Sequence, residues 1–292
     1  MYDYELEPQG FRPPKQLLLR SMIKSVGALD WTDGLITVDA LDCHREAAEA
    51  YTTFFAGRNQ RMYFARPLIA ARHPLPSLED AQATEALIFM DKQLKERGER
   101  SVIYASFRSL FWPQDPAKLN TALDHLTESG IPFIMSRPSP AAKLSERGSC
   151  RGSEYKCVFG KLAPTTGHSR SPIPMILWPI TVHQSTNAVY LTDVLDIADE
   201  LIEVRTGVGA GPRRRTGKAP FGTLDAVREE LRNVLASAFN QDGVEKRQKL
   251  LIVRKSLEDA WSEKGTARQE VADFLDHVMA LPASTLFPAQ AS

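Results

Sequence analysis

The sequence has little cysteine, no excess of either charge and no long apolar run, and each shortage excludes a class of protein. It has only three cysteines among 292 residues, none in a CxxC pair. We therefore expect neither a disulfide framework nor a zinc ribbon, and a reducing, cytoplasmic environment fits best. The 36 basic and 36 acidic side chains cancel, so we expect no overall attraction to nucleic acid or to an anionic membrane.

Apolar segments are too short for a membrane span. The longest lies around Pro174–Val182 and contains two prolines, and a membrane helix needs about 20 apolar residues. The first ten residues, MYDYELEPQG, lack the basic and apolar regions of a secretory signal. With 43% hydrophobic and 25% charged residues, the composition is that of a globular protein with one large domain or two modest ones.

Strand and helix patterns alternate through the middle of the chain. Buried strands are expected at 101–107, 131–136, 173–178 and 201–204. Helices are expected before the first strand at 79–97 and between later strands at 115–130 and 187–195. Short alternation of this kind predicts an α/β fold, a parallel sheet with crossover helices. Amphipathic helices follow at about 223–235, 250–261 and 266–278.

The first quarter of the chain has its own short pattern. It contains expected strands at 33–38 and 61–69 around an alanine-rich helix at 45–56. The segment His73–Ser77 has proline at alternate positions, which prevents both helix and strand pairing. We therefore predict a boundary near residue 75, with a second domain over 76–265 and a terminal helix and tail over 266–292.

Polar residues follow the strand at 101–107, where an open α/β sheet binds its ligands. Ser106 and Ser109 offer hydroxyl groups, and Arg108 offers a guanidinium that pairs with phosphate. This turn is therefore a candidate diphosphate site. An ordinary strand-end loop is the alternative.

A second polar group follows the strand that ends at Trp178. Gln184 has a carboxamide able to bind sugar hydroxyls in a bidentate manner, and His183 lies beside it in a loop expected before the helix. A turn with a hydrogen-bonded histidine is the alternative.

Two other clusters carry weaker signals. The basic loop Arg213–Arg215, with Lys218, is either solvated or in contact with acids or phosphate. Cys157, His168 and His183 match no zinc-ligand spacing, so we expect no metal site.

Three stretches together resemble a known family. They read SVIYASFRSLFWPQDPAKL, IPFIMS and PMILWPITVHQSTNAVYLTDVL. They resemble the carboxyl-terminal donor domain of the UDP-glycosyltransferases, in a form typical of fungi, and the similarity runs through most of residues 30–280. The resemblance implies a GT-B fold of two facing Rossmann-like domains. It implies transfer of a hexose from a UDP-sugar to a small-molecule acceptor, with the UDP-sugar as donor substrate and no metal or other cofactor.

The resemblance also assigns the parts of the chain. Residues 1–75 correspond to the end of the acceptor domain, 76–265 to the donor domain, and 266–292 to the C-terminal helix and tail. Neither His44 nor His73 occupies the position of the family's catalytic base. The resemblance thus describes a truncated chain with an incomplete first domain.

Donor-binding roles follow by resemblance at two places in the family's signature box. Ala163 and Pro164 match its start, although the stacking tryptophan expected just before them is a leucine. Trp178 and Gln184 match its end, where His183 replaces an aspartate that holds sugar hydroxyls.

The diphosphate turn and the centre of the box depart from the family. Arg108, between Ser106 and Ser109, stands where the family has glycine. Only Thr165–Ile173 separates the two ends of the box, and the family's long phosphate-binding centre is missing, with His168 as the one candidate within it.

Loss of a general base typically lowers the rate by about 10²–10⁴-fold. We therefore expect impaired or absent transferase activity. One alternative is a non-catalytic remnant that binds a nucleotide or a partner protein. Another attributes the change of character over Ala142–Ser171 to an error in the predicted coding sequence.

Overall fold

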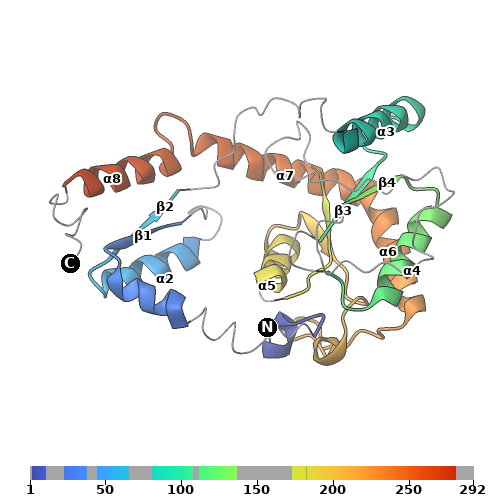
Figure 1. Cartoon of the computed structure of the whole chain (residues 1–292), viewed down its shortest axis with the longest axis horizontal. Helices are drawn as coiled ribbons and strands as arrows, with labels where there is room; N and C mark the ends of the chain where they lie inside the picture. The colour runs from blue at the N-terminus through green and yellow to red at the C-terminus, as the bar shows by residue number, and fades with distance from the viewer. Residues whose placement is uncertain are drawn as a thin grey trace. The chain divides into compact units, whose positions relative to one another are not determined.

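The structure, a computed structural model, describes residues 2–10, 23–37, 45–65, 81–107, 112–136, 173–181 and 183–280. The chain forms two compact units (Figure 1). Unit 1 contains Met1–Arg12 and Arg72–Leu250, and unit 2 contains Pro13–Ala71 and Leu251–Ser292. The first residues of the chain thus pack in unit 1, and its last described helix packs in unit 2. The assignment of these parts to acceptor and donor domains stays a prediction, and the proposed linker His73–Ser77 lies outside the described residues.

The described residues of unit 1 form two pairs of parallel strands. Strand β3 (Ile103–Ser106) pairs with β4 (Phe133–Ser136), and β5 (Met175–Leu177) pairs with β6 (Ala198–Glu200). Its helices are α3 (Ala81–Arg97), α4 (Pro116–Glu128), α5 (His183–Val189), α6 (Leu224–Ala238) and the first half of α7 (Gln241–Asp259). A short helix η1 (Asp3–Leu6) precedes them, a π-helical turn η4 (Tyr190–Val194) continues α5, and η5 (Gly207–Ala210) follows β6. The parallel pairs with helical crossovers confirm the predicted α/β class.

Helix α4 forms where local signals agree. The Asp115 carboxylate caps it by accepting hydrogen bonds from the backbone N–H groups of Ala117 (2.9 Å) and Lys118 (3.3 Å). Pro116 occupies the first turn, where its missing N–H costs nothing. Gly130, with φ of +64°, ends the segment in a left-handed conformation.

The core of unit 1 lies between the strands and the helices α4 and α6. Leu119, Leu123 and Leu126 of α4 pack with Phe133 and Met135 of β4. A second cluster joins α4 and α6 to the chain after β6, through Ala122, Leu201, Val204, Val227 and Leu231. The periodic leucines of the predicted helix are therefore core residues.

The predicted strand at 201–204 is wrong. The ladder with β5 ends at Glu200, and the Leu201 N–H donates the last bond to the Leu177 carbonyl (2.9 Å). The next two N–H groups, of Ile202 and Glu203, donate instead to the Glu230 carboxylate of α6 (2.7 and 2.9 Å). The apolar spacing of Leu201 and Val204 thus reflects burial beside α6 and not strand pairing.

Two helices begin earlier than expected. Helix α5 starts at His183 and not at Asn187. Helix α7 starts at Gln241 and not near 250, because its first turns pack through Gly243 and Lys246 and carry no apolar stripe. A Cβ at Gly243 would lie 1.9 Å from the Ala238 carbonyl oxygen, so only glycine fits this close approach.

In unit 2, the described residues include the parallel pair of β1 (Gly34–Thr37) with β2 (Arg61–Phe64). Helix α2 (Arg45–Ala56) lies between them in sequence, as predicted, and α8 (Thr266–Ala280) packs against β2. Tyr63 meets Phe274 edge to face at 5.4 Å, and the Phe64 N–H donates to the Glu270 carboxylate at 3.0 Å. The terminal helix therefore belongs to the body of unit 2.

Candidate functional site

Ser106, Trp178, His183 and Gln184 are the predicted site residues that the structure describes. The others, Arg108, Ser109, Ala163, Pro164 and His168, lie outside the described residues. Ser106 ends β3, Trp178 directly follows β5, and His183 and Gln184 begin α5. Ser106 and Trp178 therefore lie at the carboxyl ends of parallel strands in unit 1, and His183 and Gln184 lie at the start of the helix that follows β5.

An aromatic contact brings the ends of β3 and β5 together. Phe107, next to Ser106, meets Trp178 edge to face at 5.6 Å and Trp112 at 5.4 Å. Within the described part of the chain, the buried indole nitrogens of Trp112 and Trp178 have no hydrogen-bond partner. A buried donor without a partner costs about 1–3 kcal/mol. The two indole N–H groups therefore favour an acceptor here, supplied by a ligand, by water or by another part of the chain.

Ser136 was missed by the sequence analysis. It ends β4 directly opposite Ser106 in the ladder, and it is buried. Two adjacent strands thus end in serine at one edge of the sheet. The final serine of the predicted strand at 131–136 was the available signal.

Gln184 closes the turn between β5 and α5. Its Oε1 accepts from the Ile180 N–H (2.8 Å), and its own backbone N–H donates to the Thr181 carbonyl (3.0 Å). The contact fixes the carboxamide through its oxygen, and the amide Nε2 carries two further donor hydrogens. His183 is exposed in the same turn. The predicted loop position of both residues is corrected: they are the first residues of the helix.

The N-terminal segment, residues 2–10, lies against this turn and was not foreseen. Thr181 Oγ1 donates to the Glu7 carboxylate (2.7 Å), and Ser185 Oγ donates to the Leu6 carbonyl (3.3 Å). Thr181 and Glu7 are 174 positions apart in the sequence. No local pattern signals a contact over that separation.

The same segment is held by the chain that follows β6. Gln9 donates to the Val204 carbonyl (2.8 Å), and the Thr206 N–H donates to the Pro8 carbonyl (2.8 Å). The Glu5 carboxylate accepts from the Arg214 N–H (2.6 Å). Residues 2–10 are therefore an integral part of unit 1.

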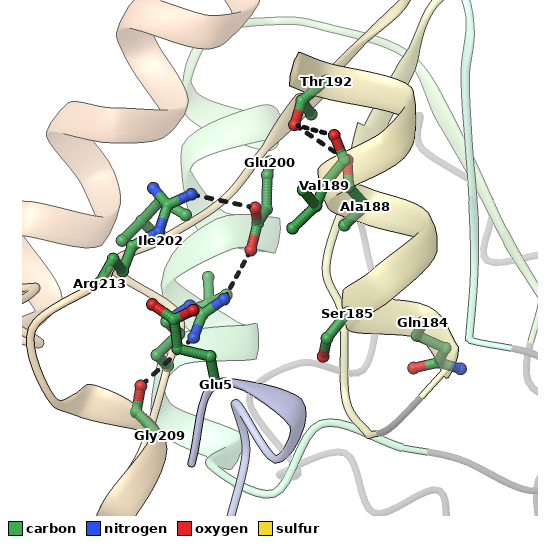
Figure 2. A network of polar contacts seen from close by, with 12 residues as sticks. Glu5, Gln184, Ser185, Ala188, Val189, Thr192, Glu200, Ile202, Gly209 and Arg213 are labelled. Atoms are coloured by element: carbon green, nitrogen blue, oxygen red, sulfur yellow. Dashed lines mark hydrogen bonds and ion pairs between the residues drawn. The ribbon is translucent and has the colours of Figure 1, made fainter. Parts of the chain in front are cut away.

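A cluster of arginines surrounds one buried carboxylate (Figure 2). Glu200, only 4% exposed, pairs with Arg205 (2.8 Å), Arg215 (2.7 Å) and Arg213 (3.4 Å). Arg205, 1% exposed, also approaches the Gly209 carbonyl. Of the two predicted alternatives for the basic loop, acid contact holds for Arg213 and Arg215. Because their guanidinium groups are paired with Glu200 within the fold, the role of Arg213 and Arg215 is structural. Gln184 lies apart from them at the start of α5 (Figure 2).

Two further findings concern the described residues alone. They contain no group of three or more His, Cys, Asp or Glu side chains arranged to hold a metal ion, while Cys157 and His168 lie outside them. Among the described helices, none combines the length and the apolar character that crossing a membrane requires.

Comparisons with known proteins bear on the fold and on the family resemblance. No protein-family model matches the chain. A curated relative, the UDP-glycosyltransferase eriJ of Hericium erinaceus, is 26% identical over 309 residues, covering 95% of this chain and 60% of the relative. The chain thus spans about 60% of the length of that relative.

Solved structures share the fold at low identity. A UGT transferase of Siraitia grosvenorii in complex with UDP superposes with a TM-score of 0.66 at 15% identity, covering 94% of this chain and 66% of that one. UGT71G1 of Medicago truncatula, complexed with UDP-glucose, gives 0.59 at 16% identity, covering 87% and 56%. The chain therefore has the GT-B fold. The predicted resemblance to the UDP-glycosyltransferases, and to a fungal member, is confirmed.

Proposed function

We propose that unit 1 binds a UDP-sugar at the carboxyl ends of β3, β4 and β5. The observation that carries the proposal is that the ends of β3 and β5, which bear Ser106 and Trp178, meet through Phe107, with Gln184 closing the turn that follows Trp178. Ligands of open α/β folds bind at this edge. The solved neighbours that share the fold include proteins complexed with UDP or UDP-glucose.

Roles within this site follow from chemistry. Ser106, with Arg108 and Ser109 of the following turn, binds the diphosphate, since hydroxyl and guanidinium groups bind phosphate well. Ala163, Pro164 and His168 belong to the nucleotide side by resemblance. Trp178 forms an apolar wall, and Gln184 with His183 contacts the hexose. The reaction is hexose transfer to a small-molecule hydroxyl, and it needs no metal or other cofactor.

We further propose that this transfer is impaired, because neither His44 nor His73 matches the family's catalytic base and none of the described histidines is well placed to replace it. Among the described histidines, His125 is buried at α4, where burial and the nearby Arg228 lower its pKa. His277 lies in unit 2 beside Tyr63. His183 is at the proposed site, but at its hexose side. A non-catalytic nucleotide-binding role is the second candidate, favoured by the same placement.

Binding and turnover test these proposals separately. Titration with UDP is expected to raise the Tm, since a ligand that binds only the folded state stabilises it. Radiolabelled UDP-glucose with a panel of phenolic acceptors is expected to give little product. Absence of any Tm change at millimolar UDP would contradict donor binding, and robust turnover would contradict impairment. Chelation with EDTA is expected to leave UDP binding unchanged.

A cytoplasmic location is also part of the proposal. Three cysteines without CxxC spacing favour a reducing compartment. Fractionation of cells that express the tagged chain tests it. Recovery of the tag in the cytosolic fraction is expected, and recovery in a secreted fraction would contradict it.

A further inference from the structure

Glu7 brings a carboxylate to the turn that carries Gln184. Thr181 Oγ1 donates to Glu7 Oε2 at 2.7 Å, and the Thr181 carbonyl accepts from the Gln184 N–H at 3.0 Å. The Gln184 carboxamide is fixed to the same turn through the Ile180 N–H. A carboxylate and a carboxamide are thus held by one short stretch of backbone.

The position of Glu7 is fixed by its main chain. Its carbonyl accepts from the Gly10 N–H (3.0 Å), and a Cβ at Gly209 would lie 2.5 Å from that oxygen and 2.6 Å from Pro8 Cα. The flanking Leu6 and Pro8 carbonyls are bonded to Ser185 and Thr206. A side chain on such an anchored segment loses little conformational freedom when it binds a ligand.

Within the part of the chain that the structure describes, the Glu7 carboxylate retains capacity for a ligand. Its two oxygens offer about four acceptor sites, of which Thr181 occupies one. A carboxylate accepts from sugar hydroxyls, while the Gln184 amide donates to them, so the two groups offer complementary partners to the hydroxyls of a hexose. A negative charge at the same place repels a sugar that carries its own carboxylate.

We propose that Glu7 binds hydroxyls of the donor hexose and selects a neutral hexose over a hexuronic acid. This inference rests on the proposed function of unit 1. It assigns part of the donor specificity to residues 2–10, which are more than 160 positions away in the sequence from β5 and α5.

The isosteric change Glu7→Gln tests the charge, with affinities for UDP, UDP-glucose and UDP-glucuronic acid measured by calorimetry. Loss of one charge-assisted hydrogen bond corresponds to about a tenfold loss of affinity. We expect UDP-glucose to bind about tenfold more weakly, UDP within twofold of wild type, and the preference for UDP-glucose over UDP-glucuronic acid to fall by about tenfold. A merely structural role would not change this preference.

Two further variants complete the design. Thr181→Val removes the contact that positions Glu7 and is expected to lower the preference for UDP-glucose over UDP-glucuronic acid severalfold. If Glu7→Gln unfolds the protein, Thr181→Val is the variant that tests the role of Glu7. Glu46→Gln, on the exposed face of α2 in unit 2, is expected to match wild type throughout. An unchanged sugar preference in a folded variant overturns the role of Glu7, while UDP binding by wild type still supports the proposed function. A wild-type chain that binds no UDP overturns both.

Discussion

At the residue scale, unit 1 depends on a few buried polar groups that each hold a backbone turn. Lys118 of α4 donates to the carbonyls of Glu203 and Arg205, both at 2.7 Å. Glu230 of α6 accepts hydrogen bonds from the N–H groups of Ile202 and Glu203. The chain after β6 therefore has its hydrogen bonds satisfied by side chains, which is why it needs no strand pairing there.

The titration of Glu230 leads to a prediction for stability against pH. Burial raises the pKa of its carboxyl to about 7. The hydrogen bonds from the backbone N–H groups of Ile202 and Glu203 lower this pKa, but the effect of burial is larger. The folded state therefore holds this proton more tightly than the unfolded state. Stability from the protonated form is full below about pH 4.5 and is lost as the pH rises through 7. We expect the wild-type free energy of unfolding to fall by about 1–3 kcal/mol from this group over that range.

Urea denaturation of Glu230→Gln at pH 5, 6, 7 and 8 is the measurement. The variant is expected to lack this fall with pH, because it carries no titrating proton. Burial lowers the pKa of His125, and this shift makes stability rise with pH. Because wild type and variant both carry His125, the difference between their free energies of unfolding isolates the contribution of Glu230. Glu229→Gln, an exposed neighbour on α6, should keep the wild-type profile. Parallel profiles for wild type and Glu230→Gln would contradict the assignment.

At the scale of elements, local signals decide some helices and tertiary contacts decide others. Helix α4 has a capping residue, a first-turn proline and periodic leucines that the sequence shows directly. The segment η1 with residues 7–10 has no such pattern and is held by contacts with distant residues. The two elements are therefore expected to respond differently to substitution.

Removal of the cap tests α4. We expect Asp115→Ala to lower the free energy of unfolding by about 0.5–2 kcal/mol, because two backbone N–H groups lose their acceptor. Thermal and urea denaturation measure the loss. Asp124→Ala, an exposed change on the same helix, should cost less than about 0.5 kcal/mol. Equal losses from the two changes would show that capping does not stabilise this helix.

A methyl group at Gly209 tests the docking of residues 2–10. A Cβ there would lie 2.5–2.7 Å from backbone atoms of Glu7 and Pro8, so we expect Gly209→Ala to displace the segment. Hydrogen exchange should then become faster at Glu7 and Gly10, whose N–H groups are bonded in the wild-type fold. Gly27→Ala, where an added Cβ meets nothing within 4 Å, serves as the control. Unchanged exchange in Gly209→Ala would contradict the docking.

At the scale of the whole molecule, the two units are discontinuous in sequence. The chain leaves unit 1 after Arg12, returns at Arg72 and leaves again after Leu250. Each unit has its own parallel strands and its own buried residues. The proposed donor site uses residues of unit 1 alone.

Ligand protection should therefore be confined to unit 1. We expect saturating UDP to slow hydrogen exchange in 103–107, 133–136 and 175–185, which border the proposed site, and to leave β1, β2 and α8 unchanged. Exchange followed by mass spectrometry resolves these peptides. Protection restricted to unit 2 would place the nucleotide elsewhere. Addition of glucose alone is the control and is expected to protect neither unit.

The sequence predicted most of this architecture but only part of the site. The strands at 103–106 and 133–136 and the helix α4 follow from apolar runs and capping residues that act within a few positions. The strand expected at 201–204 failed because Leu201 and Val204 show strand-like spacing, whereas the Glu230 carboxylate takes the N–H groups a strand would use. Gln184 was found through its motif, but Glu7 was not, since its partner lies 174 residues away.

The sequence by itself determined the α/β class, the capped helices and the resemblance to UDP-glycosyltransferases, because these depend on local periodicity and on short motifs. Only the tertiary structure decided that residues 2–10 complete unit 1, that Arg213 and Arg215 pair with a buried glutamate, and that the Glu7 carboxylate bonds to Thr181 in the turn before Gln184. These contacts join residues far apart in the chain. Their free energy comes from burial and hydrogen bonding that exist only once the chain has folded.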